Sequence, residues 1–147
     1  MGLMLRKSAP LWVGKVGAKG VLVNARITGK GFVDYYGDLR GRAVYLEAKS
    51  SKVPTSFGLA LIEAHQGLIL REGHYRGCLT GVLIRLAGSF WLMPWMVLEP
   101  YWDAYWDDEK APASIKRSAI EATCIPVYLS GKHLDLVGAL MLLSQTV

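Results

Sequence analysis

The chain has 147 residues, of which 52% are hydrophobic and 20% charged, a balance that excludes an intrinsically disordered protein. Its net charge of +5 is unevenly spread: residues 1–52 hold ten Lys or Arg against three acids, whereas residues 53–147 hold seven against nine. No apolar run approaches the roughly 20 residues of a membrane span, and no signal-like segment opens the chain. We therefore expect a cytoplasmic protein without a membrane partner, whose basic first third attracts a polyanion such as nucleic acid.

Strand patterns dominate the first 50 residues. In chain order, they predict a hairpin from residues 11–16 and 21–27, a second hairpin from residues 32–36 and 43–48 joined by residues 37–42, and a polar loop at residues 50–56. The first hairpin turns at Gly17-Ala18-Lys19-Gly20, and the loop contains Pro54.

Helical patterns become frequent after residue 58. The predicted elements are a helix at 59–71 stopped by Gly73, strands at 79–86 and 90–93, an aromatic-rich helix at 95–106, an acidic loop at 107–112, a short helix at 114–122 and a terminal helix at 134–143. This mixture predicts one α/β or α+β domain around a central sheet.

The residues that suggest chemistry are Asp34, Glu47 and Lys49, all in the second predicted hairpin. Side chains alternate along a strand, so Glu47 and Lys49 point the same way, and the hairpin brings Asp34 back beside Glu47. Two carboxylates can hold Mg²⁺, and a nearby ammonium can orient an attacking water and offset charge on a phosphate. The alternative is an Asp in a turn and a Glu/Lys pair on a solvated strand, because an Asp followed by Glu-x-Lys is a loose pattern.

A longer set of motifs resembles a known family. The quoted residues are Asp34-Tyr-Tyr-Gly, then Gly41-Arg-Ala-Val-Tyr-Leu-Glu-Ala-Lys49, Thr55-Ser-Phe and His65-Gln66. Together they resemble the RecU-type Holliday-junction resolvases of the restriction-endonuclease-like superfamily. The resemblance implies an α/β fold with a central mixed sheet flanked by helices, and a projecting basic β-hairpin arm at about residues 10–30 on a catalytic core at about 31–147. It also implies a homodimer that cuts four-way DNA junctions by paired nicks with Mg²⁺ or Mn²⁺.

The resemblance assigns roles to individual residues. It implies that Asp34 and Glu47 are metal ligands, that Lys49 is catalytic, and that Gln66 lies on the helix supporting the site. We also expect the backbone carbonyl of Ala48 to bind the metal. The family has a further Glu on a helix upstream of the Asp, whereas nothing acidic precedes Asp34 here and that helix is not evident. Either the start of the chain is missing, or Asp38 or Glu63 replaces this Glu, or the metal is bound more weakly.

Basic residues flank both hairpins. We expect DNA contacts from Lys15, Lys19, Arg26 and Lys30 at the first hairpin and from Arg40, Arg42 and Lys52 at the second. The alternative for the first group is a solvated ribbon.

Aromatic residues gather between residues 91 and 106. They are Trp91, Trp95, Tyr101, Trp102, Tyr105 and Trp106, and their spacing favours a core or dimer interface over stacking on unpaired bases.

Taken together, the residues and the resemblance predict an Mg²⁺-dependent endonuclease that resolves four-way junctions in recombination and repair. Two alternatives remain open: a nuclease of the same superfamily that acts on other DNA structures, and a structure-specific DNA-binding protein in which cleavage is weakened.

Overall fold

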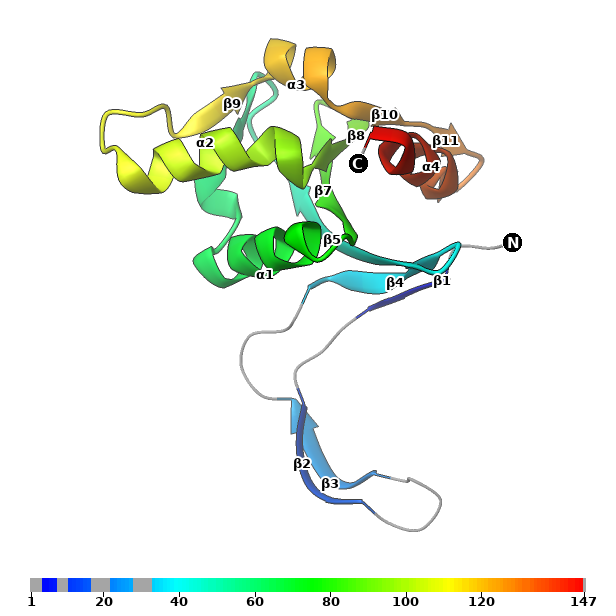
Figure 1. The fold of residues 1–147 in the computed structure, drawn as a ribbon. Coiled ribbons are helices and arrows are strands. Elements are labelled where there is room, and N and C mark those ends of the chain that lie inside the picture. The colour runs from blue at the N-terminus through cyan, green and yellow to red at the C-terminus, as the bar shows by residue number, and fades with distance from the viewer. Residues whose placement is uncertain (1–3, 8–10, 17–21, 28–32, 147) are drawn as a thin grey trace.

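The computed structural model describes residues 4–7, 11–16, 22–27 and 33–146, with side chains from Val33 onward. Its main feature is a mixed sheet of six strands (Figure 1). In spatial order these are β1 (Met4–Lys7), β4 (Tyr35–Leu39), β5 (Arg42–Ser50), β7 (Leu79–Leu86), β8 (Ser89–Pro94) and β10 (Ile125–Val127). Strands β5 and β7 are parallel, and every other neighbouring pair is antiparallel. The fold is α/β with a mixed central sheet, as predicted.

Three smaller strand pairs and four α-helices complete the described chain. The pairs are β2 (Leu11–Val16) with β3 (Leu22–Ile27), β6 (Ser56–Gly58) with β9 (Ser114–Lys116), and β11 (Leu129–Ser130) with β12 (His133–Leu134). The helices are α1 (Ala64–Tyr75), α2 (Trp95–Asp107), α3 (Arg117–Thr123) and α4 (Leu136–Thr146), and a 3₁₀ turn, η2 (Leu59–Leu61), precedes α1. Figure 1 shows the β2–β3 ribbon apart from the six-stranded sheet.

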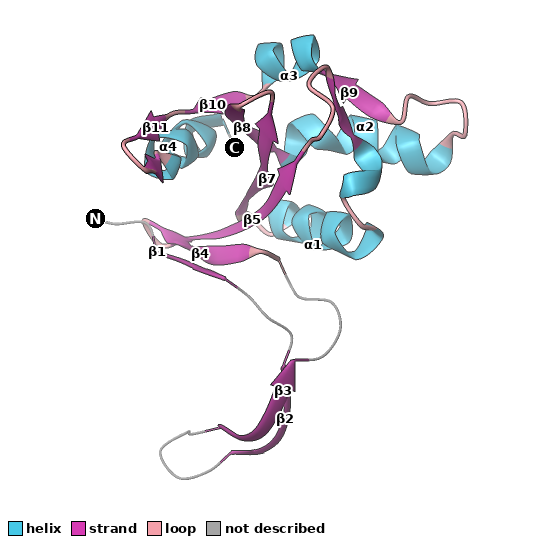
Figure 2. Cartoon of the chain, turned by 180° about the vertical axis from the view of Figure 1, so that it is seen from behind, coloured by secondary structure: helices cyan, strands magenta, loops and turns pink. Residues whose placement is uncertain are grey.

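Helices cover both faces of the sheet (Figure 2). Side chains alternate along β5, so Val44 and Leu46 face α4, where they join a buried cluster with Leu140 and Leu143. Tyr45 faces the other way and packs against the cluster formed with α1 and α2. Because parallel strands need a crossover, the chain leaves β5, forms α1 and returns as β7. The catalytic candidates on β5 therefore lie between α1 and the sheet.

The second hairpin is tighter than predicted. Residues 37–39 belong to β4, and the connection to β5 is only Arg40 and Gly41, with Leu39 opposite Arg42. Both turn residues have positive φ, +54° and +77°, which suits a two-residue turn between twisted strands. The prediction of a six-residue connection was wrong because glycine and charged residues that look like a loop also fit an exposed strand.

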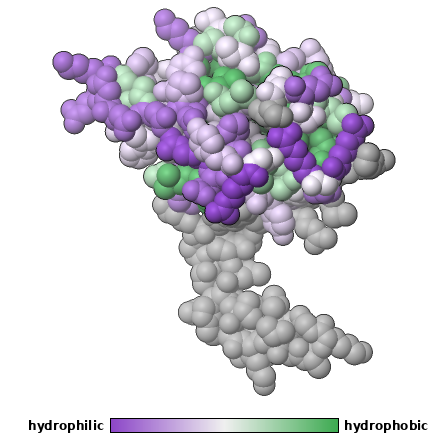
Figure 3. Space-filling model, in the orientation of Figure 1, coloured by the Kyte–Doolittle hydropathy of each residue, from purple (hydrophilic) through white to green (hydrophobic). Residues whose placement is uncertain are grey.

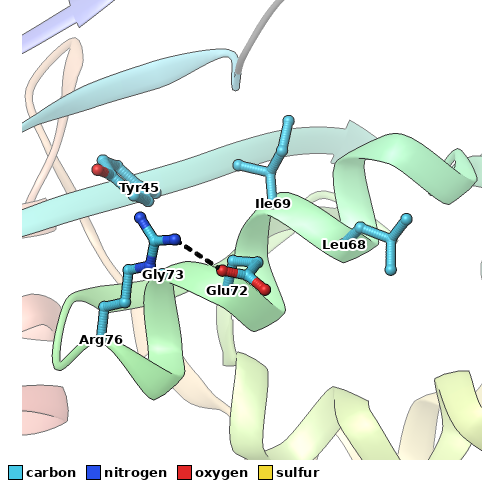
Figure 4. A pocket seen from close by; sticks show the side chains of 6 residues that line it. All are labelled: Tyr45, Leu68, Ile69, Glu72, Gly73 and Arg76. Atoms are coloured by element: carbon cyan, nitrogen blue, oxygen red, sulfur yellow. Dashed lines mark ion pairs between the residues drawn. The ribbon is translucent and has the colours of Figure 1, made fainter.

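The helix predicted at residues 59–71 was misplaced. Its first residues form η2, α1 begins at Ala64, and the helix continues past Gly73 to Tyr75. A Cβ on Gly73 would lie 2.7 Å from the Tyr45 ring, so this glycine permits close helix–sheet packing and does not end the helix (Figure 4).

The chain after α2 also departs from the prediction. Residues 114–122 form the short strand β9 and then α3, because Ile115 of β9 pairs with Phe57 of β6 in the core. Strand β10 was not predicted, and the terminal helix begins and ends later than expected. The positions of these elements depend on burial against residues that are distant in the sequence.

The aromatic residues of α2 mainly serve packing. Trp95 and Trp102 are almost fully buried, with ring centroids 6.3 Å apart, whereas Trp106 is exposed. A Cβ on Gly67 of α1 would lie 2.2 Å from the Trp102 ring, so this glycine allows the two helices to approach. Apolar side chains on the surface in Figure 3 lie in patches separated by polar ones. Of the described helices, none has both the length and the apolar composition that crossing a bilayer requires.

Candidate nuclease site

The predicted carboxylates meet at one end of the hairpin. Asp34 immediately precedes β4, and its Oδ2 accepts a hydrogen bond of 2.9 Å from the Ala48 N–H of β5. This bond holds the Asp34 carboxylate against the β5 strand, next to the Glu47 carboxyl. The antiparallel register explains the position, because Tyr35 lies opposite Leu46 and the preceding residue therefore reaches the level of Glu47 and Ala48.

Glu47 is an unusual acid because its side chain is only 1% exposed. The pKa of its carboxyl is raised from an ordinary 4.5 to about 7, first because burial disfavours the charged form and then because the Asp34 carboxyl adjoins it. The Lys49 ammonium, 3.9 Å from Glu47 Oε2, opposes this rise. A perturbed acid of this kind marks a candidate functional site.

Gln66 links the site to the start of α1. Its Nε2 donates a hydrogen bond of 3.1 Å to Glu47 Oε2, and its Oε1 accepts one of 2.9 Å from the Glu63 N–H. Glu63 is the N-cap residue, and its side chain in turn accepts from the Gln66 backbone in a capping box. One amide therefore fixes both the first turn of the helix and one oxygen of the buried carboxyl. Sequence reasoning missed the part of Glu63, although a Glu three residues before a Gln could have indicated it.

The main chain supplies a third oxygen at this place. The N–H and C=O of one strand residue point to the same side, and the Ala48 N–H points to Asp34. The Ala48 carbonyl therefore also faces Asp34 and away from β7. Among the described residues, no group of three or more His, Cys, Asp or Glu side chains could hold an ion. A site here would thus combine two carboxylates with the main chain, and hard oxygen ligands of this kind suit Mg²⁺ or Mn²⁺.

Neither suggested replacement for the upstream Glu joins the two carboxylates. Asp38 accepts a hydrogen bond of 3.1 Å from the Gly41 N–H and so belongs to the hairpin turn at the far end of β4. The side chain of Glu63 is half-exposed, with its Oε2 3.3 Å from His65 Nδ1.

The predicted DNA contacts divide into two groups. Arg40 and Lys52 are exposed, and Arg42 donates from Nε to the Gly77 carbonyl at 2.7 Å, so part of this guanidinium is engaged within the protein. Lys15 and Arg26 lie on β2 and β3, but their side chains are outside the described part of the chain. Lys19 and Lys30 lie wholly outside the described residues.

The sequence matches a known protein family. A family model described as RecU: Recombination protein U matches residues 2–140, which is nearly the whole chain. The chain belongs to the RecU family. Similar proteins named Holliday junction resolvase RecU occur in two strains of Staphylococcus epidermidis and in Staphylococcus carnosus. Each is 28% identical over 101 residues, covering 67% of this chain and 49% of the relative. This RecU chain thus spans about half the length of the curated relatives that it matches.

Proposed function

We propose that this RecU-family chain is a divalent-metal-dependent endonuclease that resolves four-way DNA junctions by paired symmetric nicks, in recombination and repair. The observation that carries the proposal is the contact between Asp34 and the buried Glu47, with the Lys49 ammonium 3.9 Å from Glu47. Two carboxyls held together in a buried place are costly without a counter-cation. The naming of the staphylococcal relatives as Holliday junction resolvases supports the choice of substrate.

The donor set fits a hard divalent cation. Asp34, Glu47 and the Ala48 carbonyl would hold Mg²⁺ or Mn²⁺. Burial and the neighbouring Asp34 carboxyl raise the pKa of Glu47, and a bound cation would favour its charged form. When bound, the metal would stabilise charge on the scissile phosphate and lower the pKa of a bound water.

The protein's own groups would act around this centre. Lys49 is in position to orient the attacking water and to offset charge that develops on the phosphate. Gln66 holds Glu47 in one orientation through its 3.1 Å hydrogen bond, so the carboxyl does not have to reorganise when DNA arrives.

Binding of the DNA backbone would come from basic residues around the two hairpins. These are Lys15, Lys19, Arg26 and Lys30 in the arm, and Arg40, Arg42 and Lys52 near the catalytic hairpin. Phosphate contacts of this kind set the position of the duplex and carry no sequence information. A four-way junction also has two related strands to cut, so one active site per chain calls for a homodimer with two-fold symmetry.

The proposal is tested by cleavage of a labelled four-way junction with and without Mg²⁺. Glu47→Gln should abolish cleavage and leave junction binding nearly intact, because it removes one metal ligand at almost constant volume. Glu109→Gln, in the exposed loop after α2, is the matched control and should cut normally. Normal turnover by Glu47→Gln would overturn the assignment of the site.

The same assay distinguishes the two other candidate functions. Equal cutting of the junction and of linear duplex with the same sequence would indicate a nuclease of broader substrate range. Tight junction binding without any Mg²⁺-dependent product from the wild-type chain would indicate a structure-specific DNA-binding protein.

A further inference from the structure

A small pocket lies directly behind the carboxylates, on the opposite face of the sheet. It has a volume of about 200 Å³, and we call it the Phe90 pocket; its lining residues are Ala48, Lys49, Ser50, Leu83, Arg85 and Phe90. Helix α4 covers this face at Val44 and Leu46, which are buried, but Leu83 and Phe90 remain partly exposed. The end of the sheet beside the candidate site therefore presents an accessible, mostly apolar surface.

The chemistry of the Phe90 pocket suits a flat, electron-rich ring. Arg85 and Phe90 lie opposite each other on β7 and β8, and the Arg85 guanidinium carbon is 6.0 Å from the centre of the Phe90 ring. Aromatic rings and guanidinium planes are the surfaces on which proteins stack unpaired nucleobases. The lining contains no acid, so the positive charge of Arg85 is complementary to a polyanion.

The position of the pocket connects it to the candidate site. Lys49 both lines the pocket and lies 3.9 Å from Glu47, and the Ala48 backbone bonds Asp34 while Ala48 also lines the pocket. The pocket and the carboxylates thus lie on opposite faces of one three-residue segment of β5.

We propose that the Phe90 pocket binds one unpaired nucleobase of branched DNA, on the face of the sheet opposite Asp34 and Glu47. This inference rests on the proposed function and adds to it a physical basis for substrate choice. A base in continuous duplex must first be unstacked and unpaired before it can enter a pocket, whereas a branch point already supplies loosened bases. Stacking in the pocket therefore favours branched DNA over linear duplex.

The test is a cycle that combines DNA and protein changes, with binding measured by fluorescence anisotropy in EDTA so that no strand is cut. A single abasic analogue replaces each nucleotide at the branch point in turn. For the wild-type chain, at least one abasic junction should bind about fivefold or more weakly than the intact junction, the loss expected for one stacked base. Phe90→Leu keeps apolar volume but removes the ring face, and should bind intact and abasic junctions equally.

Two further variants make the result decisive. Arg85→Gln changes an exposed side chain, removes the guanidinium above the Phe90 ring but keeps the ring, and should also reduce the abasic penalty. Trp106→Leu alters an exposed aromatic residue on α2 and should keep the full penalty. Two results would overturn the pocket assignment. In the first, the wild-type chain binds every abasic junction as tightly as the intact junction. In the second, the abasic penalty is unchanged in both Phe90→Leu and Arg85→Gln. The cycle measures binding only. If the chain binds junctions but does not cut them, the proposed function is contradicted, but the abasic penalties still show whether the Phe90 pocket binds a base.

Discussion

Glu47 is buried, lies next to another carboxyl and belongs to the candidate site. Its ionisation should therefore change the free energy of unfolding of the protein. Its folded pKa is about 7 against an ordinary 4.5, so the folded state holds this proton more tightly than the unfolded state does. The sign follows from linkage: the stabilising contribution is complete below about pH 4.5 and is lost as the pH rises through 7.

We therefore predict that the metal-free protein loses stability between pH 5 and pH 8. The share due to Glu47 should be about 3 kcal/mol, since each unit of pKa difference corresponds to about 1.4 kcal/mol. Urea unfolding in EDTA at several pH values measures this loss, and Glu47→Gln should remove most of it. Parallel pH profiles for the wild type and this variant would contradict the prediction. Added Mg²⁺ should stabilise the wild type at pH 8 and have little effect on Glu47→Gln.

Gln66 has two hydrogen-bonding tasks, and its replacement should reveal both. Gln66→Ala removes the donor to Glu47 and the acceptor for the Glu63 N–H. We predict that kcat for junction cleavage falls about tenfold or more, as for residues that orient metal ligands. Stability should fall by roughly 1–2 kcal/mol. Gln145→Ala, on an exposed position of α4, should change neither quantity; a wild-type kcat in Gln66→Ala would limit this residue to capping the helix.

At the residue scale, the sequence predicted the meeting of Asp34, Glu47 and Lys49, because strand alternation and hairpin pairing are local rules. It could not predict that Glu47 is almost fully buried, since burial depends on how α1 packs over β5. Nor did it predict the Phe90 pocket, whose residues come from β5 and from the β7–β8 hairpin, more than 30 positions further along the chain.

Among the elements, the β7–β8 hairpin contains a conformational strain that can be removed. Its two turn residues are Ala87 and Gly88, with φ of +50° and +79°. Alanine disfavours this left-handed region, whereas asparagine tolerates it and is preferred at the first position of such turns.

We predict that Ala87→Asn raises the free energy of unfolding by roughly 1 kcal/mol, within the range of other backbone-compatible stabilising changes. Chemical denaturation measures the effect. Ala122→Asn, at an exposed position of helix α3, is the control and should lower stability by a few tenths of a kcal/mol, at about the difference in helix propensity. Equal effects of the two changes would show that the turn conformation does not matter.

Elements with strong local signals were predicted well. The strands at residues 79–86 and 90–93 and the helix at 95–106 agree with β7, β8 and α2 to within one or two residues. Elements that form by pairing with distant strands were not predicted. Strand β9 forms because it pairs with β6, and β10 forms because it pairs with β8. A three-residue strand carries too little pattern to be recognised without its neighbour.

For the whole molecule, the uneven charge should appear in the salt dependence of DNA binding. Ten of the 17 Lys and Arg residues lie in residues 1–52. If arm lysines contact phosphates, the double variant Lys15→Ala/Lys19→Ala should reduce the slope of log affinity against log salt by about 0.9 for each lost contact. Lys110→Ala/Lys132→Ala removes the same charge from the other part of the chain and should leave the slope unchanged. An unaltered slope in the arm variant would make these lysines a solvated face.

Paired nicks also require a defined assembly. Large apolar side chains remain exposed on the described surface, among them Tyr128 at 71%, Tyr75 at 69% and Leu129 at 58%. Together with the apolar residues in the sequence of the arm, they offer material for an interface between two copies. We predict a mass of twice 16.2 kDa by light scattering at micromolar concentration. A mass near 16.2 kDa that is unchanged when junction DNA is added would exclude the dimer and the paired-nick mechanism.

The short edge strand β10 has a consequence for the behaviour of the protein in concentrated solution. It offers only three residues, and its middle residue, Pro126, has no N–H to donate. A strand from another molecule would find few main-chain partners there, and natural sheets use short, proline-containing edges to prevent uncontrolled edge-to-edge aggregation. This end of the sheet therefore limits strand addition, and it protects the sheet that carries Glu47 from growing into larger aggregates.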